Sequence, residues 1–182
     1  MRVFLDTEFT NLMAPRLLSV GLVADTETAC ELYVEIDLAS EEGRRRSRAS
    51  TEFVHETVLT QWGRVAGAEV SEYELGRRAG LWLLALTEQG PVEVVYDYKT
   101  DADLLEAALK VSGLLEALAP HVTWSIVSYL SGEPDFERAQ EASWAHTYSV
   151  NRLDRHHALA DARALRAGFV AVHGTDKADA TR

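Results

Sequence analysis

The sequence predicts a single α/β domain in which a mixed β-sheet is flanked by helices. Three strand-like segments come first, and segments with helical periodicity then alternate with further strands. The order β-β-β followed by α-β-α-β-α is typical of a sheet covered by helices. A chain of 182 residues without an internal repeat or linker has the length of one domain. We expect this domain to span residues 1–173, followed by a disordered tail at 174–182.

The first three strands are predicted from apolar runs and turn signals. The apolar run Val3–Leu5 opens the chain, and a loop containing Pro15 follows it. Residues 17–24 are largely apolar, and residues 31–37 alternate between apolar and polar side chains. The polar residues 25–28 between these two segments indicate an antiparallel hairpin. The chain therefore begins with three antiparallel strands.

A basic segment at residues 40–50 follows the third strand. It contains Arg44, Arg45, Arg46 and Arg48 and no clear apolar pattern, so we expect a surface loop. The alternative is a phosphate-binding cluster, because this is the densest positive charge in an acidic protein. The next stretch, residues 53–62, is expected to be helical or irregular.

The second half of the chain alternates helices and strands. Ser71 and Glu74 form a capping-box pattern, which starts a helix that runs to about Glu88. Residues 92–96 are rich in β-branched side chains and predict a strand, after which a helix begins near Asp101. The remaining predicted elements are a strand at 121–128, a helix around 136–146 and a helix at 158–173.

The composition excludes several classes of protein. A net charge of −11 argues against non-specific coating of nucleic acid, since phosphate contacts are normally supplied by a surplus of Lys and Arg. No apolar run approaches the roughly 18 residues of a membrane span, and no secretory signal is expected. The single cysteine, Cys30, excludes an intramolecular disulfide and a Cys-based zinc cluster. We therefore expect a cytoplasmic protein.

Two carboxylates, Asp6 and Glu8, follow the first apolar run. Residues two apart on a strand point to the same face, roughly 6 to 7 Å apart. Such a pair is costly unless a cation is shared, because each negative charge pushes the other carboxyl toward protonation. One divalent ion, or two of them, would relieve this cost and create a reactive centre. The alternative interpretation is a solvated strand end without any metal.

Two further positions can complete this pair. Asp101 lies at the boundary between a predicted strand and a predicted helix. Asp97 and Asp103 are alternatives for the same role, and Asp101 could instead be only the N-cap of the helix. Near the C-terminus, His156 precedes Asp161 by five residues at the start of a predicted helix. There the helix dipole favours a carboxylate that remains available as a metal ligand. The adjacent His157 has no assigned role.

These motifs resemble those of the DEDDh branch of the DnaQ-like 3′-to-5′ exonucleases. The matching segments are Asp6-Thr7-Glu8-Phe9-Thr10 and residues 156–162, in the family's order, and the resemblance spans roughly residues 1–169. The middle motif departs from the family, which often has an Asn and an aromatic residue just before its aspartate. Asp101 still fits better than Asp103, because an apolar pair follows it at the family's spacing. The small stand-alone bacterial exoribonuclease-like members look most similar.

The resemblance implies a ribonuclease H-like fold and a two-metal-ion hydrolysis with Mg²⁺ or Mn²⁺. Asp6, Glu8 and Asp161 would hold one ion, and Asp6 would bridge to a second ion near Asp101. His156 would accept the proton of the attacking water, a role that suits its ordinary pKa near 6.5. The product would be a nucleoside 5′-monophosphate.

The resemblance also implies a substrate, which is the 3′ end of a single strand, with RNA more likely than DNA. The backbone at Phe9 and Thr10 would lie against the terminal nucleotide, and Phe9 would either stack on a base or belong to the core. A DNA exonuclease, an enzyme for short oligonucleotides, a non-catalytic binding or scaffold protein, and a metal protein unrelated to nucleic acid remain alternatives. A homodimer is a further expectation.

Overall fold

The computed structural model describes residues 1–26 and 30–174. Residues 175–182, nearly all of the expected tail, lie outside this range, so the tail prediction stays untested. Among the described residues, no helix is long and apolar enough to cross a membrane. The elements in chain order are β1 (Arg2–Phe9), β2 (Leu17–Ala24), β3 (Glu31–Ile36), α1 (Glu41–Ala49), α2 (Glu52–Thr57), η1 (Leu59–Gln61), β4 (Glu69–Val70), α3 (Glu72–Thr87), β5 (Val92–Tyr96), α4 (Lys99–Val111), α5 (Leu115–Leu118), β6 (Val122–Ile126), η2 (Ser128–Leu130), α6 (Pro134–Asn151) and α7 (Ala158–His173).

The six strands form one mixed sheet in the order β4-β3-β2-β1-β5-β6. Strands β1, β2 and β3 are antiparallel, whereas β5 and β6 lie parallel to β1 and to each other. The predicted α/β class and mixed sheet are therefore confirmed, and the strand order is consistent with a ribonuclease H-like arrangement. The short edge strand β4, parallel to β3, was not expected.

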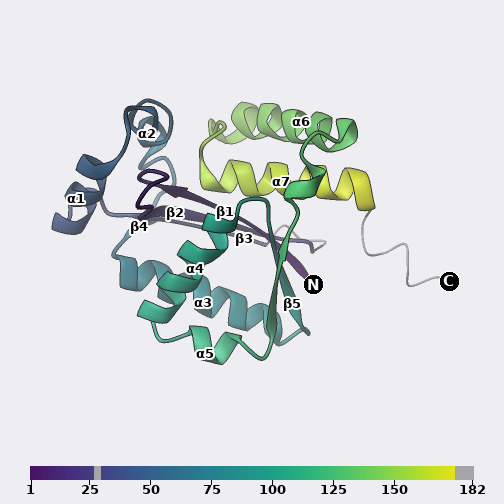
Figure 1. Cartoon of the computed structure of the whole chain (residues 1–182), viewed down its shortest axis with the longest axis horizontal. Coiled ribbons are helices and arrows are strands. Elements are labelled where there is room, and N and C mark those ends of the chain that lie inside the picture. Colours follow the sequence, from purple (N-terminus) through teal and green to yellow (C-terminus); the bar gives the residue numbers. More distant parts are fainter. Residues whose placement is uncertain (27–29, 175–182) are drawn as a thin grey trace.

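Helices cover both faces of the sheet. Figure 1 shows α6 and α7 on one face and α3, α4 and α5 on the other, with α1 and α2 beyond one end of the sheet. The side chains of β1 alternate between the two helical layers. Val3 and Leu5 pack toward α3 and α4, while Phe4 packs against Phe169 of α7. The sheet is therefore buried on both sides along its centre.

The basic segment is helical, so the predicted surface loop is wrong. Ser40 caps α1, and the helix is anchored by a buried guanidinium instead of an apolar stripe. Arg46 pairs with Glu42 of its own helix (3.0 Å) and with Glu72 at the start of α3 (2.7 Å). Because Arg46 is enclosed by these partners, its role is structural. Phosphate binding stays a prediction for the exposed arginines Arg44, Arg45 and Arg48.

Candidate metal centre

Strand β1 places Asp6 and Glu8 on the face that packs against α7. They share this face with Phe4, whereas Thr7 points to the opposite side, toward α4. Asp6 lies opposite Gly21 of β2, and the pairing of β1 with β2 shifts register between Glu8 and Phe9. The two acids therefore lie on one face of the second half of β1, as the alternation of a strand predicts.

Helix α4 contributes Asp101 from its first turn. The side chain is 2% exposed, and its Oδ1 accepts a hydrogen bond from the Thr7 hydroxyl at 2.7 Å. Asp103 instead points away from the sheet and pairs with Lys99 at the surface. Of these two acids, only Asp101 reaches the site, and the helix starts at Lys99, so Asp101 is not its N-cap.

Helix α7 contributes Asp161, and two donors hold its carboxylate. The indole Nε1 of Trp144 donates to Oδ1 at 2.6 Å, and the backbone N–H of His156 donates to Oδ2 at 2.8 Å. Trp144 comes from α6, so the two helices on this face fix the carboxylate together. Gly21 permits the close approach of α7, because a Cβ at that position would lie 2.3 Å from the carbonyl oxygen of Ala158.

The ligand atoms fall into two neighbouring groups. One consists of Glu8, His156 and Asp161, and the other of Asp6, Asp97 and Asp101, and within each group the atoms lie within 4.8 Å of one another. Asp97 is one of the two acids that compete with Asp101 in the sequence. It directly follows β5, which is parallel to β1, and ligand sites lie at the carboxyl ends of parallel strands.

The electrostatics of these acids favour a bound cation. Burial, followed by the neighbouring carboxylates, raises the pKa of Asp6 and of Glu8 well above the ordinary value. Burial raises the pKa of Asp101 and of Asp161 to about 7, and it also raises the pKa of Asp97. In addition, Oδ2 of Asp6 is buried without a hydrogen-bond partner in the described part of the chain. A divalent cation fits this set, because it would supply the missing partner and offset the repulsion.

The two consecutive histidines have different surroundings. His156 is half-buried at the site, its backbone is left-handed (φ 63°), and its ring meets Phe53 edge-on at 5.0 Å between centroids. Burial, followed by the charge of Arg155, lowers its pKa. His157 is buried outside the site, where it stacks on Tyr33 at 4.3 Å. Neither ring nitrogen of His157 has a hydrogen-bond partner among the described residues, and burial lowers its pKa to about 4.

A pocket of about 700 Å³ joins the acids to an apolar rim. Phe9 stacks on Tyr98 at 6.3 Å, so Phe9 belongs to the rim and not to the core. Thr10 does not line the pocket, because its side chain is buried and its hydroxyl accepts a hydrogen bond from the backbone N–H of Arg16.

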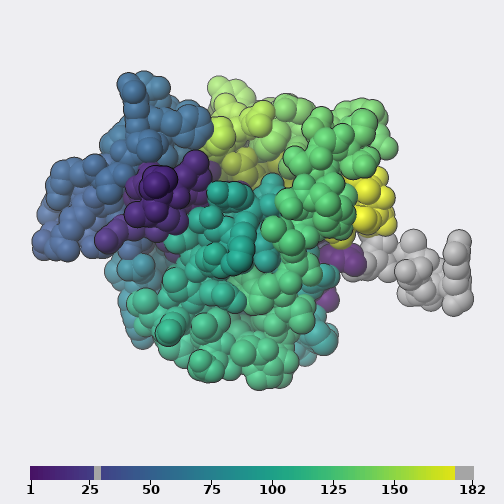
Figure 2. Space-filling view, viewed as in Figure 1, coloured from purple at the N-terminus to yellow at the C-terminus, as the bar shows by residue number. Residues whose placement is uncertain are grey.

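The loop after β1 lies between the segment that contains α1 and α2 and the beginning of α4 (Figure 2). Exposed apolar side chains at the mouth of the pocket are Leu12, Met13, Phe53 and Tyr98.

Four of the predicted acids and the predicted histidine thus meet at one pocket, formed by Asp6, Glu8, Asp101, His156 and Asp161. The sequence indicated Asp97 only as a competitor of Asp101 and Phe9 as a candidate for base stacking, and it did not indicate Trp144, Phe53 or Tyr98. Asp97 carried a signal, as an acid at the end of a predicted strand, whereas Trp144 lies within a helix whose long-range contacts no local pattern indicates. No family model matches the chain, and no curated protein matches it.

Proposed function

We propose that this protein is a metal-dependent 3′-to-5′ exonuclease that releases nucleoside 5′-monophosphates from single-stranded nucleic acid. The observation that supports it is the gathering of five carboxylates and a half-buried histidine at one pocket with an apolar rim. RNA is the preferred substrate in this proposal, on the basis of the resemblance to stand-alone exoribonuclease-like enzymes.

The donor set suits two Mg²⁺ or Mn²⁺ ions. Asp6, Glu8 and Asp161 would hold one of them. Asp6 would share the other with Asp97 and Asp101, whose carboxylate oxygens lie within 4.8 Å of its own. Two such ions supply charge stabilisation for the attacking and leaving oxygens of an in-line displacement. The raised carboxyl pKa values support this because they mark buried carboxylates whose negative charge a cation would offset, and metal binding would release their protons.

His156 is the proposed general base. Its lowered pKa keeps the imidazole neutral at neutral pH, so that a ring nitrogen can accept the proton of the attacking water. The water oxygen then forms a bond to the terminal phosphorus, and the bond from that phosphorus to the 3′ oxygen of the preceding nucleotide breaks. This 3′ oxygen takes a proton from solvent, and the imidazolium of His156 releases its proton to solvent, which completes the hydrolysis.

The apolar rim suits nucleobases. Aromatic side chains stack on every base without reading its sequence, which matches an enzyme that removes nucleotides one after another. The stacked pair of Phe9 and Tyr98 and the exposed ring of Phe53 supply such surfaces beside the acids.

Incubation of the pure protein with 3′-labelled and 5′-labelled RNA and DNA strands, with Mg²⁺, Mn²⁺ or a chelator, tests the proposal. The expected result is stepwise shortening from the 3′ end that stops with the chelator and is faster on RNA. Asp6→Ala should be more damaging than Glu8→Ala, because Asp6 belongs to both proposed ion sites. Unchanged shortening in Asp6→Ala or Asp161→Ala would contradict the metal assignment, and strands left intact by the unmodified protein would point to a binding or scaffold role.

A further inference from the structure

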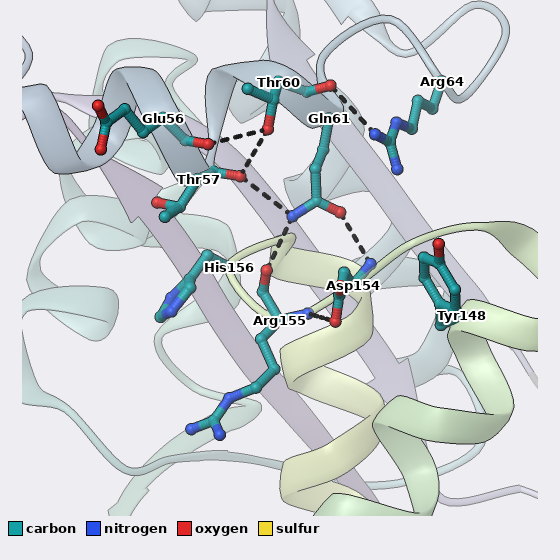
Figure 3. Close-up of a pocket in the computed structure, with 9 residues that line it drawn as sticks. All are labelled: Glu56, Thr57, Thr60, Gln61, Arg64, Tyr148, Asp154, Arg155 and His156. Carbon is teal, nitrogen blue, oxygen red and sulfur yellow. Dashed lines mark hydrogen bonds between the residues drawn. The ribbon is translucent and has the colours of Figure 1, made fainter.

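The buried side chain of Gln61 forms hydrogen bonds with the loop that carries His156. Its side chain is 4% exposed, and it lies in η1, far in sequence from the loop that carries His156. The amide Nε2 donates to the carbonyl oxygen of Arg155 at 2.8 Å, and Oε1 accepts the backbone N–H of Asp154 at 2.8 Å. Figure 3 shows both bonds, together with a third from Nε2 to the carbonyl oxygen of Thr57 at 3.2 Å.

The loop held by Gln61 has an uncommon backbone. His156 adopts a left-handed φ angle of 63°, which side chains with a Cβ seldom take outside special contexts, whereas the left-handed Arg152 is the ordinary C-cap of α6. Such a conformation persists only where the surroundings determine it. Gln61 bonds to the two residues before His156, and the N–H of His156 itself donates to Asp161 at 2.8 Å.

The ring of His156 has few constraints of its own. It is half-buried, and its described contact is the edge-on approach to Phe53, whose own ring is largely exposed. The direction of the imidazole therefore depends on the backbone at residues 154–156. Gln61 bonds this backbone at residues 154 and 155, and Asp161 bonds it at residue 156.

We propose that Gln61 is a positioning residue that fixes the backbone before His156 and so aims the imidazole at the attacking water. The inference rests on the proposed function, because the aim of His156 affects a rate only if His156 is the general base. The bonds of Gln61 go to backbone groups and not to the proposed metal ligands, so its effect should fall on turnover and not on metal binding.

The test compares Gln61→Met with Gln61→Ala and with the control Thr60→Ala. Methionine keeps the length of glutamine without its hydrogen bonds, so it separates bonding from packing even where the alanine variant fails to fold. Thr60 and Gln61 both line the pocket drawn in Figure 3, which is not the pocket of the acids, but the Thr60 hydroxyl donates to carbonyl groups of Glu56 and Thr57 in the preceding helix.

In Gln61→Met we expect kcat to fall by about 10- to 100-fold, the scale of a misplaced catalytic group. KM and the affinity for Mn²⁺ should stay within about threefold, and Thr60→Ala should resemble the unmodified protein. A loss of kcat no larger than in the control, or an equal loss of Mn²⁺ affinity, would overturn the proposal.

Hydrogen–deuterium exchange of residues 153–157 supplies a readout that needs no activity. Gln61→Met should speed exchange in this loop, while the strands of the sheet keep their protection. Unchanged exchange overturns the positioning role whether or not the protein is a nuclease. Conversely, an inactive unmodified protein would overturn the proposed function, and faster exchange in the variant would still show that Gln61 fixes this backbone.

Discussion

Gly21 and Ala158 are in direct backbone contact across the sheet and α7, with no room for a side chain between them. A Cβ at Gly21 would lie 2.3 Å from the carbonyl oxygen of Ala158 and 2.5 Å from the backbone nitrogen of Leu159. Gly21 is also the residue opposite Asp6 in the pairing of β1 with β2. The same contact therefore sets the separation between the acids of β1 and the helix that carries Asp161.

Gly21→Ala should displace the start of α7 and separate Asp161 from Asp6. The atoms in the way belong to backbone, which cannot rotate aside, so overpacking should cost about 1–3 kcal/mol of unfolding free energy. We expect weaker Mn²⁺ binding, measured by titration calorimetry, in a protein that still folds. Unchanged Mn²⁺ affinity would mean that the site tolerates a shift of α7.

Asp101→Asn and Asp103→Asn form a matched pair on one helix. An asparagine in place of Asp101 can still accept the hydrogen bond from Thr7, but the substitution removes a buried negative charge from the site. We expect Asp101→Asn to lower nuclease activity by about 100-fold or more, whereas the exposed Asp103 should tolerate the change within about twofold. The reverse ranking would identify Asp103 as the ligand.

Stability of the metal-free protein should fall as pH rises. The pKa of Asp101 and of Asp161 is about 7 in the folded protein and near 4 when unfolded, so the folded state binds more protons between these values. The free energy of unfolding therefore decreases through about pH 4 to 7 and stays low above it. Thermal unfolding of chelator-treated protein at about pH 5 and about pH 8 measures this change.

Added Mg²⁺ should raise the melting temperature more at about pH 8 than at about pH 5, because it binds the ionised carboxylates. Asp101→Asn supplies the control, since removing one titrating carboxyl should flatten the dependence and stabilise the metal-free protein at high pH. A metal-free melting temperature that rises over this range would contradict the prediction.

His156→Ala and His157→Ala should fail in different ways. Loss of His156, the proposed general base, should lower kcat by about 10²- to 10⁴-fold while Mn²⁺ still binds. His157 is buried against Tyr33, so His157→Ala should mainly lower the melting temperature by leaving a cavity. If His156→Ala loses Mn²⁺ instead, His156 is a ligand beside Glu8 and Asp161, a role that their spacing also permits.

Local patterns determined most of the fold and the order of the site residues. Strand alternation put Asp6 and Glu8 on one face, and helical spacing placed Asp161 in the first turn of α7, because both effects act over a few residues. The helix at Glu72–Thr87 was confirmed with Ser71 as its cap for the same reason. By contrast, the sequence did not predict α1, because the residue that anchors this helix is the buried Arg46. Its partner Glu72 belongs to α3, and no local pattern shows this pairing.

Only the tertiary structure decided which acids meet and what holds them. Asp97 joins Asp6 because β5 lies parallel to β1, and Asp103 is excluded by the direction of its side chain on α4. Trp144 bonds to Asp161, and Gln61 bonds to the backbone of Arg155, which is far from it in sequence. Such hydrogen bonds produce no periodic pattern of residues from which they could be predicted. The sequence by itself thus indicated Asp6, Glu8, Asp101, His156 and Asp161 as candidate site residues, because each stands at the end of a strand or the start of a helix. Long-range packing determined their partners, because contacts between distant segments depend on the whole fold.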